Sequence, residues 1–184
     1  MDIVISTKRI LQFLLILAWL IFVGLSIEAG GYLFNTIYTL FYQPLGAQNF
    51  WNGLNLSALY SYDIGFYAVF TSLVCIVSIL KSIMFYIIIR LLSNKEFITQ
   101  LPFNKLMRVL ILNISILSFG ISMFSFWSIK YYKWFIEQGV YMPDIEILKL
   151  SSGDVWLFMG IVLLIISQII KRGEQLQAEN DLTI

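Results

Sequence analysis

Residues 10–27 read ILQFLLILAWLIFVGLSI and contain no charged side chain. An α-helix needs about 20 mostly apolar residues to cross the hydrocarbon core of a bilayer, which is about 30 Å thick. Three more stretches are comparably apolar: residues 67–92, 106–127 and 155–170. The sequence therefore predicts an all-α integral membrane protein, with four transmembrane helices packed as a bundle in a single membrane domain over residues 1–184. The first run is longer than the apolar core of about 7–15 residues in a cleaved signal peptide, so we expect it to remain as a helix.

The composition also favours a membrane protein and excludes several other classes. Of the 184 residues, 59% are hydrophobic and 12% are charged, against roughly 45–50% and about 25% in soluble domains. The net charge of +1 argues against direct nucleic-acid binding, which needs a basic face. The chain has no His and one Cys, which excludes His-dependent triads, zinc clusters and disulfide frameworks. No motif indicates an enzyme, and we expect neither a metal nor a cofactor.

Basic residues are unevenly distributed among the segments that join the predicted helices. Cytoplasmic loops of membrane proteins carry an excess of Lys and Arg. With four spans, one side of the membrane receives eight basic residues: Lys8, Arg9, Arg90, Lys95, Lys105, Arg108, Lys171 and Arg172. The other side receives three basic residues, Lys130, Lys133 and Lys149, which are offset by acidic residues that include Glu137, Asp144, Glu146 and Asp154. Both termini are therefore predicted to be cytoplasmic, with residues 171–184 as a cytoplasmic tail.

The outer loops are rich in aromatic residues. The first of them, residues 28–66, contains many Tyr, Phe and Trp side chains, which favour the membrane interface. We expect short interfacial helices at residues 31–42 and 130–138. The alternative is that these aromatic side chains cover a pocket for an apolar or amphipathic ligand.

Serines recur along the third span at positions 115, 118, 122 and 125. This spacing places them on one helix face. Small residues allow helices in a bilayer to approach closely, so the pattern predicts helix–helix packing within the bundle.

Lys81 is the unusual residue of the second span, because an ionisable group in a membrane helix is unfavourable and commonly marks a site. One reading places its ammonium in the bundle interior, with Ser78, Ser82 or Asn113 as partner. The other reading is a tilted helix whose lysine extends to the inner interface. Glu28 is expected to be too distant. The candidate ligand-binding residues are Lys81, Ser78 and Asn113.

The C-terminal tail combines basic, acidic and apolar residues in a distinctive order. Lys171-Arg172-Gly173 is followed by the run Gln177-Ala178-Glu179-Asn180-Asp181-Leu182-Thr183-Ile184. The tail resembles the C-terminal signature of a bacterial membrane-protein family, the domain-of-unknown-function 2975 family. Pro102-Phe103, the basic and apolar stretch up to Arg108, and the four-span layout extend the resemblance over most of the chain. Relatives often follow Pro-Phe with Ser or Thr and then an acidic residue, whereas this chain has Asn104 and Lys105.

The resemblance implies a bacterial inner-membrane protein of a family without an established activity. Family members are often encoded beside a small helix-turn-helix regulator, which implies that the membrane protein holds or releases a DNA-binding partner. An acidic and partly apolar tail would complement the basic face of such a regulator. The candidate partner-binding residues are Arg172, Gly173, Glu179, Asn180, Asp181 and Leu182.

The sequence leaves three hypotheses for function. The first is a membrane sensor or antagonist that controls a cytosolic helix-turn-helix transcription regulator through its tail and inner loop. The second is a binding or transport protein for a small apolar or amphipathic ligand, with Lys81 and the outer aromatics at its site. The third is a structural subunit of a membrane complex, in which the serine face contacts another protein. The expected partners are the lipid bilayer, the regulator and, as a point left open, further copies of the chain in a homo-oligomer.

Overall fold

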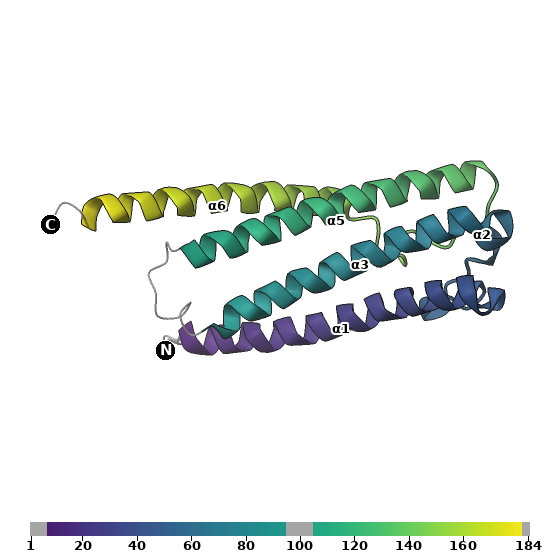
Figure 1. Ribbon diagram of the computed structural model, residues 1–184, viewed down its shortest axis with the longest axis horizontal. Helices are drawn as coiled ribbons and strands as arrows, with labels where there is room; N and C mark the ends of the chain where they lie inside the picture. Colours follow the sequence, from purple (N-terminus) through teal and green to yellow (C-terminus); the bar gives the residue numbers. More distant parts are fainter. Residues whose placement is uncertain (1–6, 95–104, 182–184) are drawn as a thin grey trace, which may run out of the picture.

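The computed structural model describes residues 7–94 and 105–181, and this part of the chain is helical apart from short connections. Four long helices form a helical bundle: α1 (Thr7–Phe41), α3 (Ile64–Ser93), α5 (Lys105–Glu137) and α6 (Gly153–Asp181) (Figure 1). Each of them is long and apolar enough to cross a membrane, and each contains one of the four predicted stretches. The prediction of an all-α protein with four such helices is confirmed.

Two helices extend well beyond the predicted spans. α1 continues through residues 28–41 and α5 continues through residues 130–137. The short interfacial helices expected in these regions are therefore the last turns of α1 and α5, and that prediction is wrong. The physical reason is the absence of a strong helix breaker, because the first proline after Glu28 is Pro44.

The connection between α1 and α3, which was expected to be the first outer loop, is correspondingly shorter than predicted. It runs over residues 42–63 and contains two 3-10 turns, η1 (Pro44–Ala47) and η2 (Trp51–Gly53), and the short helix α2 (Ser57–Tyr62). Asp63 closes the connection, since its carboxylate accepts a hydrogen bond from the Phe66 N–H at 2.8 Å. This N-cap satisfies one of the free amides at the start of α3.

The four long helices pack in the order in which they occur in the chain. α1 packs on α3, α3 on α5, and α5 on α6, whereas α1 and α6 have no extensive contact in the described part of the chain. Ser26 and Ser82 share a hydrogen bond of 2.8 Å between their hydroxyl groups and so join α1 to α3. The array is therefore open between α1 and α6, and α3 and α5 lie between these two outer helices (Figure 1).

The serine face of α5 lies inside the protein. Five hydroxyl-bearing residues along it are buried: Ser115, Ser118, Ser122, Ser125 and Ser128. The Ser115 Oγ donates to the carbonyl of Gly160 at 2.8 Å and joins α5 to α6. The predicted packing within the bundle is confirmed, and this face is not available to contact another protein.

α6 begins far from the end of α5. A Cβ at Gly153, its first residue, would lie 3.2 Å from the Cβ of Ser125, and twelve residues of α5 follow Ser125 up to Glu137. At about 1.5 Å per residue this distance is about 18 Å. The connection of residues 138–152 therefore returns along the helices before α6 starts, which explains why the fourth apolar stretch is the shortest.

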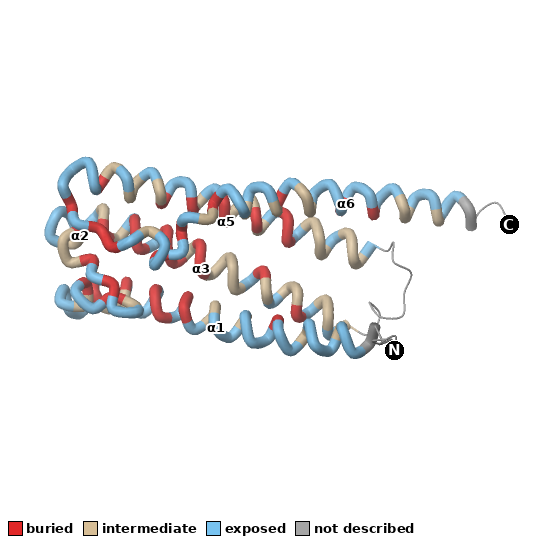
Figure 2. The backbone as a smooth tube through the Cα atoms, turned by 180° about the vertical axis from the view of Figure 1, so that it is seen from behind, coloured by how far each residue is buried: buried red, intermediate tan, exposed pale blue. Residues whose placement is uncertain are grey.

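A packed core occupies the end of the molecule that carries α2, where buried positions are concentrated (Figure 2). Several aromatic residues expected at the membrane interface are buried there, at 1% exposure or less: Tyr32, Phe50 and Phe135. Phe41 and Tyr42 remain exposed at 78% each. The aromatic residues of the outer region are thus divided between a core and an exposed surface, because the long α1 and α5 provide faces on which the connection 42–63 packs.

Candidate functional site

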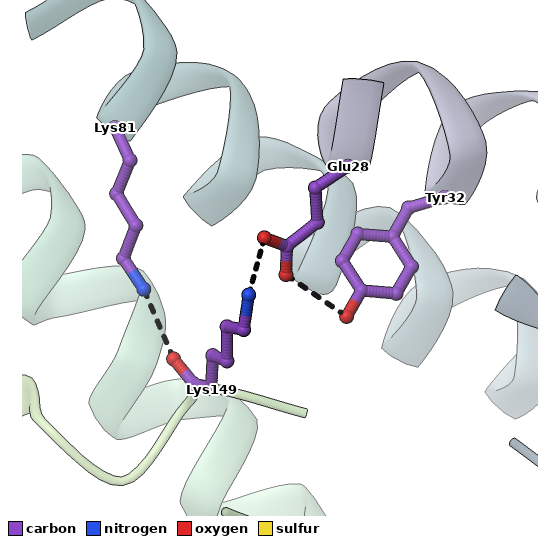
Figure 3. Close-up of polar contacts among 4 residues, drawn as sticks. All are labelled: Glu28, Tyr32, Lys81 and Lys149. Atoms are coloured by element: carbon purple, nitrogen blue, oxygen red, sulfur yellow. Dashed lines mark hydrogen bonds and ion pairs between the residues drawn. The ribbon is translucent and has the colours of Figure 1, made fainter. Parts of the chain in front are cut away.

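An ion pair joins α1 to the connection that precedes α6. The Lys149 Nζ lies 2.6 Å from Glu28 Oε2, and the Tyr32 hydroxyl donates to Glu28 Oε1 at 3.3 Å (Figure 3). The Glu28 side chain is 10% exposed and that of Lys149 is 57% exposed. A buried carboxylate needs such partners, because an isolated charge away from water is very unfavourable. Glu28 is therefore held inside the protein, and Lys149 is the accessible partner of the pair.

Lys149 has an uncommon backbone conformation. Its φ angle is +53°, in the left-handed region that costs a residue with a side chain roughly 1–2 kcal/mol. Its neighbours Leu148 and Leu150 are both buried, at 2% and 1% exposure. Burial of these two leucines opposes the backbone cost, and it holds Lys149 between them. Such strained residues are common at ligand sites.

The Lys81 ammonium lies against the same residue. Its Nζ donates to the carbonyl oxygen of Lys149 at 3.0 Å (Figure 3). The same Nζ lies 5.8 Å from the ring centroid of Trp156. The Trp156 indole is itself anchored, since its Nε1 donates to Ser152 Oγ at 3.2 Å. Within the described residues, Lys81 forms no ion pair. Its partners belong to the connection before α6 and to the start of that helix, so of the two readings left open for Lys81 the geometry does not favour an extension along α3 toward Arg90.

A cavity of about 410 Å³ lies beside Lys81, on the open side of the array between α1 and α6. Its lining combines apolar side chains with two ammonium groups and one carboxylate: Ile21, Leu25, Lys81, Phe85, Glu146, Lys149, Ser151, Ser152 and Trp156. Ligand sites are usually apolar concavities with a few polar groups of this kind. The cavity is therefore the best candidate functional site in the described part of the chain.

The residues predicted to accompany Lys81 do not meet it. Asn113 is exposed on α5 and Ser78 is buried in α3, and neither lines the cavity. Ser82 is hydrogen-bonded to Ser26 instead. Glu28, which was expected to be too distant from Lys81, forms no ion pair with it but joins the cluster through Lys149. A ligand-binding role for Ser78 and Asn113 stays a prediction that the geometry does not favour.

The outer aromatics line a different cavity. This second space, of about 530 Å³, is formed by Phe66, Trp127, Lys130, Tyr131 and Trp134. It shares no lining residue with the cavity beside Lys81. The two features that the ligand hypothesis combined in one site are therefore separate.

The tail continues α6 as a helix and does not turn at Gly173. Arg108 Nε lies 3.3 Å from Glu174 Oε2, so an acidic residue of the tail pairs with a basic residue at the start of α5. Arg172 and Glu179 are exposed. Some residues of the predicted partner site and of the loop between α3 and α5 lie outside the described residues: Leu182, Lys95, Pro102, Phe103 and Asn104. Asn180 and Asp181 belong to α6, but their side chains are not described.

Sequence reasoning overlooked Lys149, Glu28 and Trp156 as members of the site. The position of Glu28 could have indicated a site, because it is the first charged residue after eighteen uncharged ones. Lys149 stands between two leucines, which indicates a residue held at the edge of a packed segment. Nothing in the sequence links these residues to Lys81.

Comparison with known proteins identifies no relative: no family model matches the chain, and no curated protein and no solved structure matches it. The resemblance to the domain-of-unknown-function 2975 family therefore stays a prediction, and the function has to be argued from the geometry alone.

Proposed function

We propose that the protein is a membrane-embedded binding protein for a small amphipathic ligand, which occupies the cavity between α1 and α6. The observation that carries the proposal is the Lys81 ammonium, which lines a largely apolar cavity and has no ion-pair partner among the described residues. A charge in such surroundings is unfavourable unless it is paired. A polar group of the ligand would supply the partner, while its apolar part would contact Leu25 and Phe85.

The position of the cavity across the membrane supports a ligand that enters from the lipid. Leu80, next to Lys81, lies beside Gly120, and twelve residues separate Arg108 from Gly120. At about 1.5 Å per residue this spacing is about 18 Å, against a hydrocarbon core of about 30 Å. With Arg108 at the inner boundary, Lys81 would lie in the outer half of the hydrocarbon region. A ligand there would reach the site between α1 and α6.

The proposal predicts that a small molecule is retained when the protein is purified with its surrounding lipid in nanodiscs. Mass spectrometry of the extracted small molecules would identify it. Replacing Lys81→Met should lower its retention several-fold, and Leu25→Trp should lower it by filling the cavity. Lys133→Met changes an exposed lysine elsewhere on α5 and should have no effect. The proposal would be abandoned if no small molecule is retained, or if Lys81→Met leaves retention unchanged at equal expression.

A second proposal concerns the end of the molecule at which α6 finishes. We propose that the protein resides in a bacterial inner membrane and that its tail helix controls a cytosolic helix-turn-helix regulator. The observation that favours it is the continuation of α6 to Asp181, with Leu176 exposed and Glu174 anchored on Arg108. An anchored helix with an exposed apolar residue offers a partner an ordered surface.

Deletion of residues 173–184 tests this second proposal. The shortened chain should still insert in the membrane, because the fourth apolar stretch, residues 155–170, lies entirely before Gly173. Transcript profiling should reveal altered expression of the regulator's target genes relative to the full chain. A transcript profile identical to that of the full chain, at equal membrane abundance, would rule the proposal out.

A further inference from the structure

We infer that Glu28 is an internal substitute for the acidic group of the ligand, and that the ligand is an anionic amphiphile with one hydrocarbon chain. The inference rests on the proposed function of the same cavity and adds the charge of the ligand and a residue that controls its affinity. In the structure, Glu28 pairs with Lys149. When the ligand binds, its acidic group takes the place of Glu28 at Lys149 and also pairs with Lys81.

The charges around the cavity favour an anion. Two lysines line it, Lys81 and Lys149, against one carboxylate, Glu146. Glu146 is exposed and pairs with neither lysine. Glu28 does not line the cavity, and its ion pair is with Lys149. With Glu28 included the four charges balance, but the Lys81 ammonium has no ion-pair partner among the described residues, so an incoming anion would be attracted to it even before Lys149 is released.

The two lysines also have hydrogen-bonding capacity to spare. An ammonium group has three donors. Lys81 uses one of them for the Lys149 carbonyl, and Lys149 uses one for Glu28. A carboxylate or phosphate group offers several acceptor oxygens, so it would satisfy donors on both residues at once. A neutral hydroxyl group could accept hydrogen bonds but carries no charge to offset the two ammonium groups, and a quaternary ammonium group has no acceptor.

The size and lining of the cavity limit the rest of the ligand. Its volume of about 410 Å³ is near the small end of ligand cavities, which span roughly 300–1,000 Å³. Ile21, Leu25, Phe85 and Trp156 provide an apolar surface beside the charged groups. This combination fits an acidic group on a single chain better than a phospholipid with two chains.

Glu28 can leave Lys149 without being stranded. Its other carboxylate oxygen accepts a hydrogen bond from Tyr32 at 3.3 Å, so one partner remains when Lys149 turns to the ligand. Glu28 therefore competes with the ligand for one ammonium group. Removing its charge should strengthen ligand binding, which is the opposite of what is expected for a residue that contacts the ligand.

The test uses the full chain in nanodiscs of phosphatidylcholine and four probes with the same twelve-carbon chain: dodecanoate, dodecyl phosphate, dodecanol and dodecyltrimethylammonium. Equilibrium binding of each radiolabelled probe is measured against empty nanodiscs. We expect one or both anions to bind more than roughly tenfold tighter than the other two probes. The comparison of dodecanoate with dodecyl phosphate then identifies the acidic group as carboxylate or phosphate.

Variants test the role of Glu28. Glu28→Gln should tighten binding of the preferred anion roughly fivefold or more, whereas Lys149→Gln should weaken it roughly tenfold. Glu28→Asp, which keeps the charge but shortens its reach to Lys149, should also tighten binding and covers the case in which Glu28→Gln fails to fold. Lys133→Gln is the matched control for loss of a lysine and should not change binding.

Each other outcome overturns the inference in a recognisable way. Equal binding of dodecanol and the anions would overturn it and leave the proposed function standing, as would tighter binding of dodecyltrimethylammonium. Weaker anion binding by a folded Glu28→Gln protein would show that Glu28 contacts the ligand. Binding of none of the four probes, together with no retained small molecule, would overturn both the inference and the proposed function.

Discussion

Lys149 joins Glu28 to Lys81 through two different groups. Its side-chain ammonium pairs with Glu28, and its backbone carbonyl oxygen accepts a hydrogen bond from Lys81. The backbone of this residue is left-handed, at a φ of +53°. At the scale of single residues, the site is therefore built around one strained position held by two buried leucines. Glu28 is the buried member of the pair, and a buried charge left without its partner is destabilising, so Glu28 and Lys149 are best understood as a unit.

Two substitutions at Lys149 separate the backbone from the charge. Lys149→Gly and Lys149→Val both remove the ammonium, but only glycine adopts a positive φ without strain. We expect the valine variant to be less stable than the glycine variant by roughly 1–3 kcal/mol. The variants are heated in detergent, and size-exclusion chromatography measures the folded fraction left at each temperature, which gives the unfolding midpoint of each variant. Equal unfolding midpoints for the two variants would contradict the backbone argument.

At the scale of helices, α1 is unusual because it continues through two adjacent glycines and still contacts the outer connection. Glycine lowers helix stability by roughly 1 kcal/mol relative to alanine. A Cβ added at Gly31 would overlap the ring of Trp51, whereas one at Gly30 would meet nothing within 4 Å. Gly31 is therefore required for packing of the turn η2 against α1, and Gly30 is not.

This contrast predicts opposite effects for two neighbouring substitutions. Gly30→Ala should keep or raise the thermal stability of the protein, since it improves helix propensity in open space. Gly31→Ala should lower stability by roughly 1–3 kcal/mol, the usual cost of overpacking. Both variants are compared with the unaltered chain in the same detergent. Similar midpoints for the two would show that Trp51 does not pack on α1 as the structure has it.

At the scale of the whole molecule, the order of packing decides where the cavity lies. α6 starts beside Ser125, about twelve residues before the end of α5, so the connection 138–152 returns to the middle of α1 and α3. The start of α1 and the end of α6 lie at the same end of the molecule (Figure 1). The end of α3, which carries Arg90, and the start of α5, which carries Arg108, lie at this end as well (Figure 1). This arrangement is consistent with the proposed cytoplasmic position of both termini.

Chemical labelling in cells tests that orientation. In a Cys75→Ser background, a single cysteine is placed at Tyr141 or at Gln175, both exposed. A membrane-impermeant maleimide should label Tyr141→Cys in intact cells and Gln175→Cys only after permeabilisation. Labelling of both positions, or of Gln175→Cys alone, in intact cells would contradict the proposed orientation. Cys75→Ser should be tolerated, because Thr36 Oγ1 lies 3.6 Å from the Cys75 sulfur and offers a serine hydroxyl a partner.

The sequence by itself determined the four apolar helices and the oddity of Lys81, because both are local: a run of apolar residues and one charge within it can be read in a short window. The ends of α1 and α5 were less predictable, since they depend on what the outer connection packs against. Only the tertiary structure decided that Glu28 meets Lys149, 121 positions along the chain. That contact requires the late start of α6 and the return of the preceding connection, which no local pattern encodes. The site is therefore a property of how the helices pack, whereas the helices are a property of the residues in them.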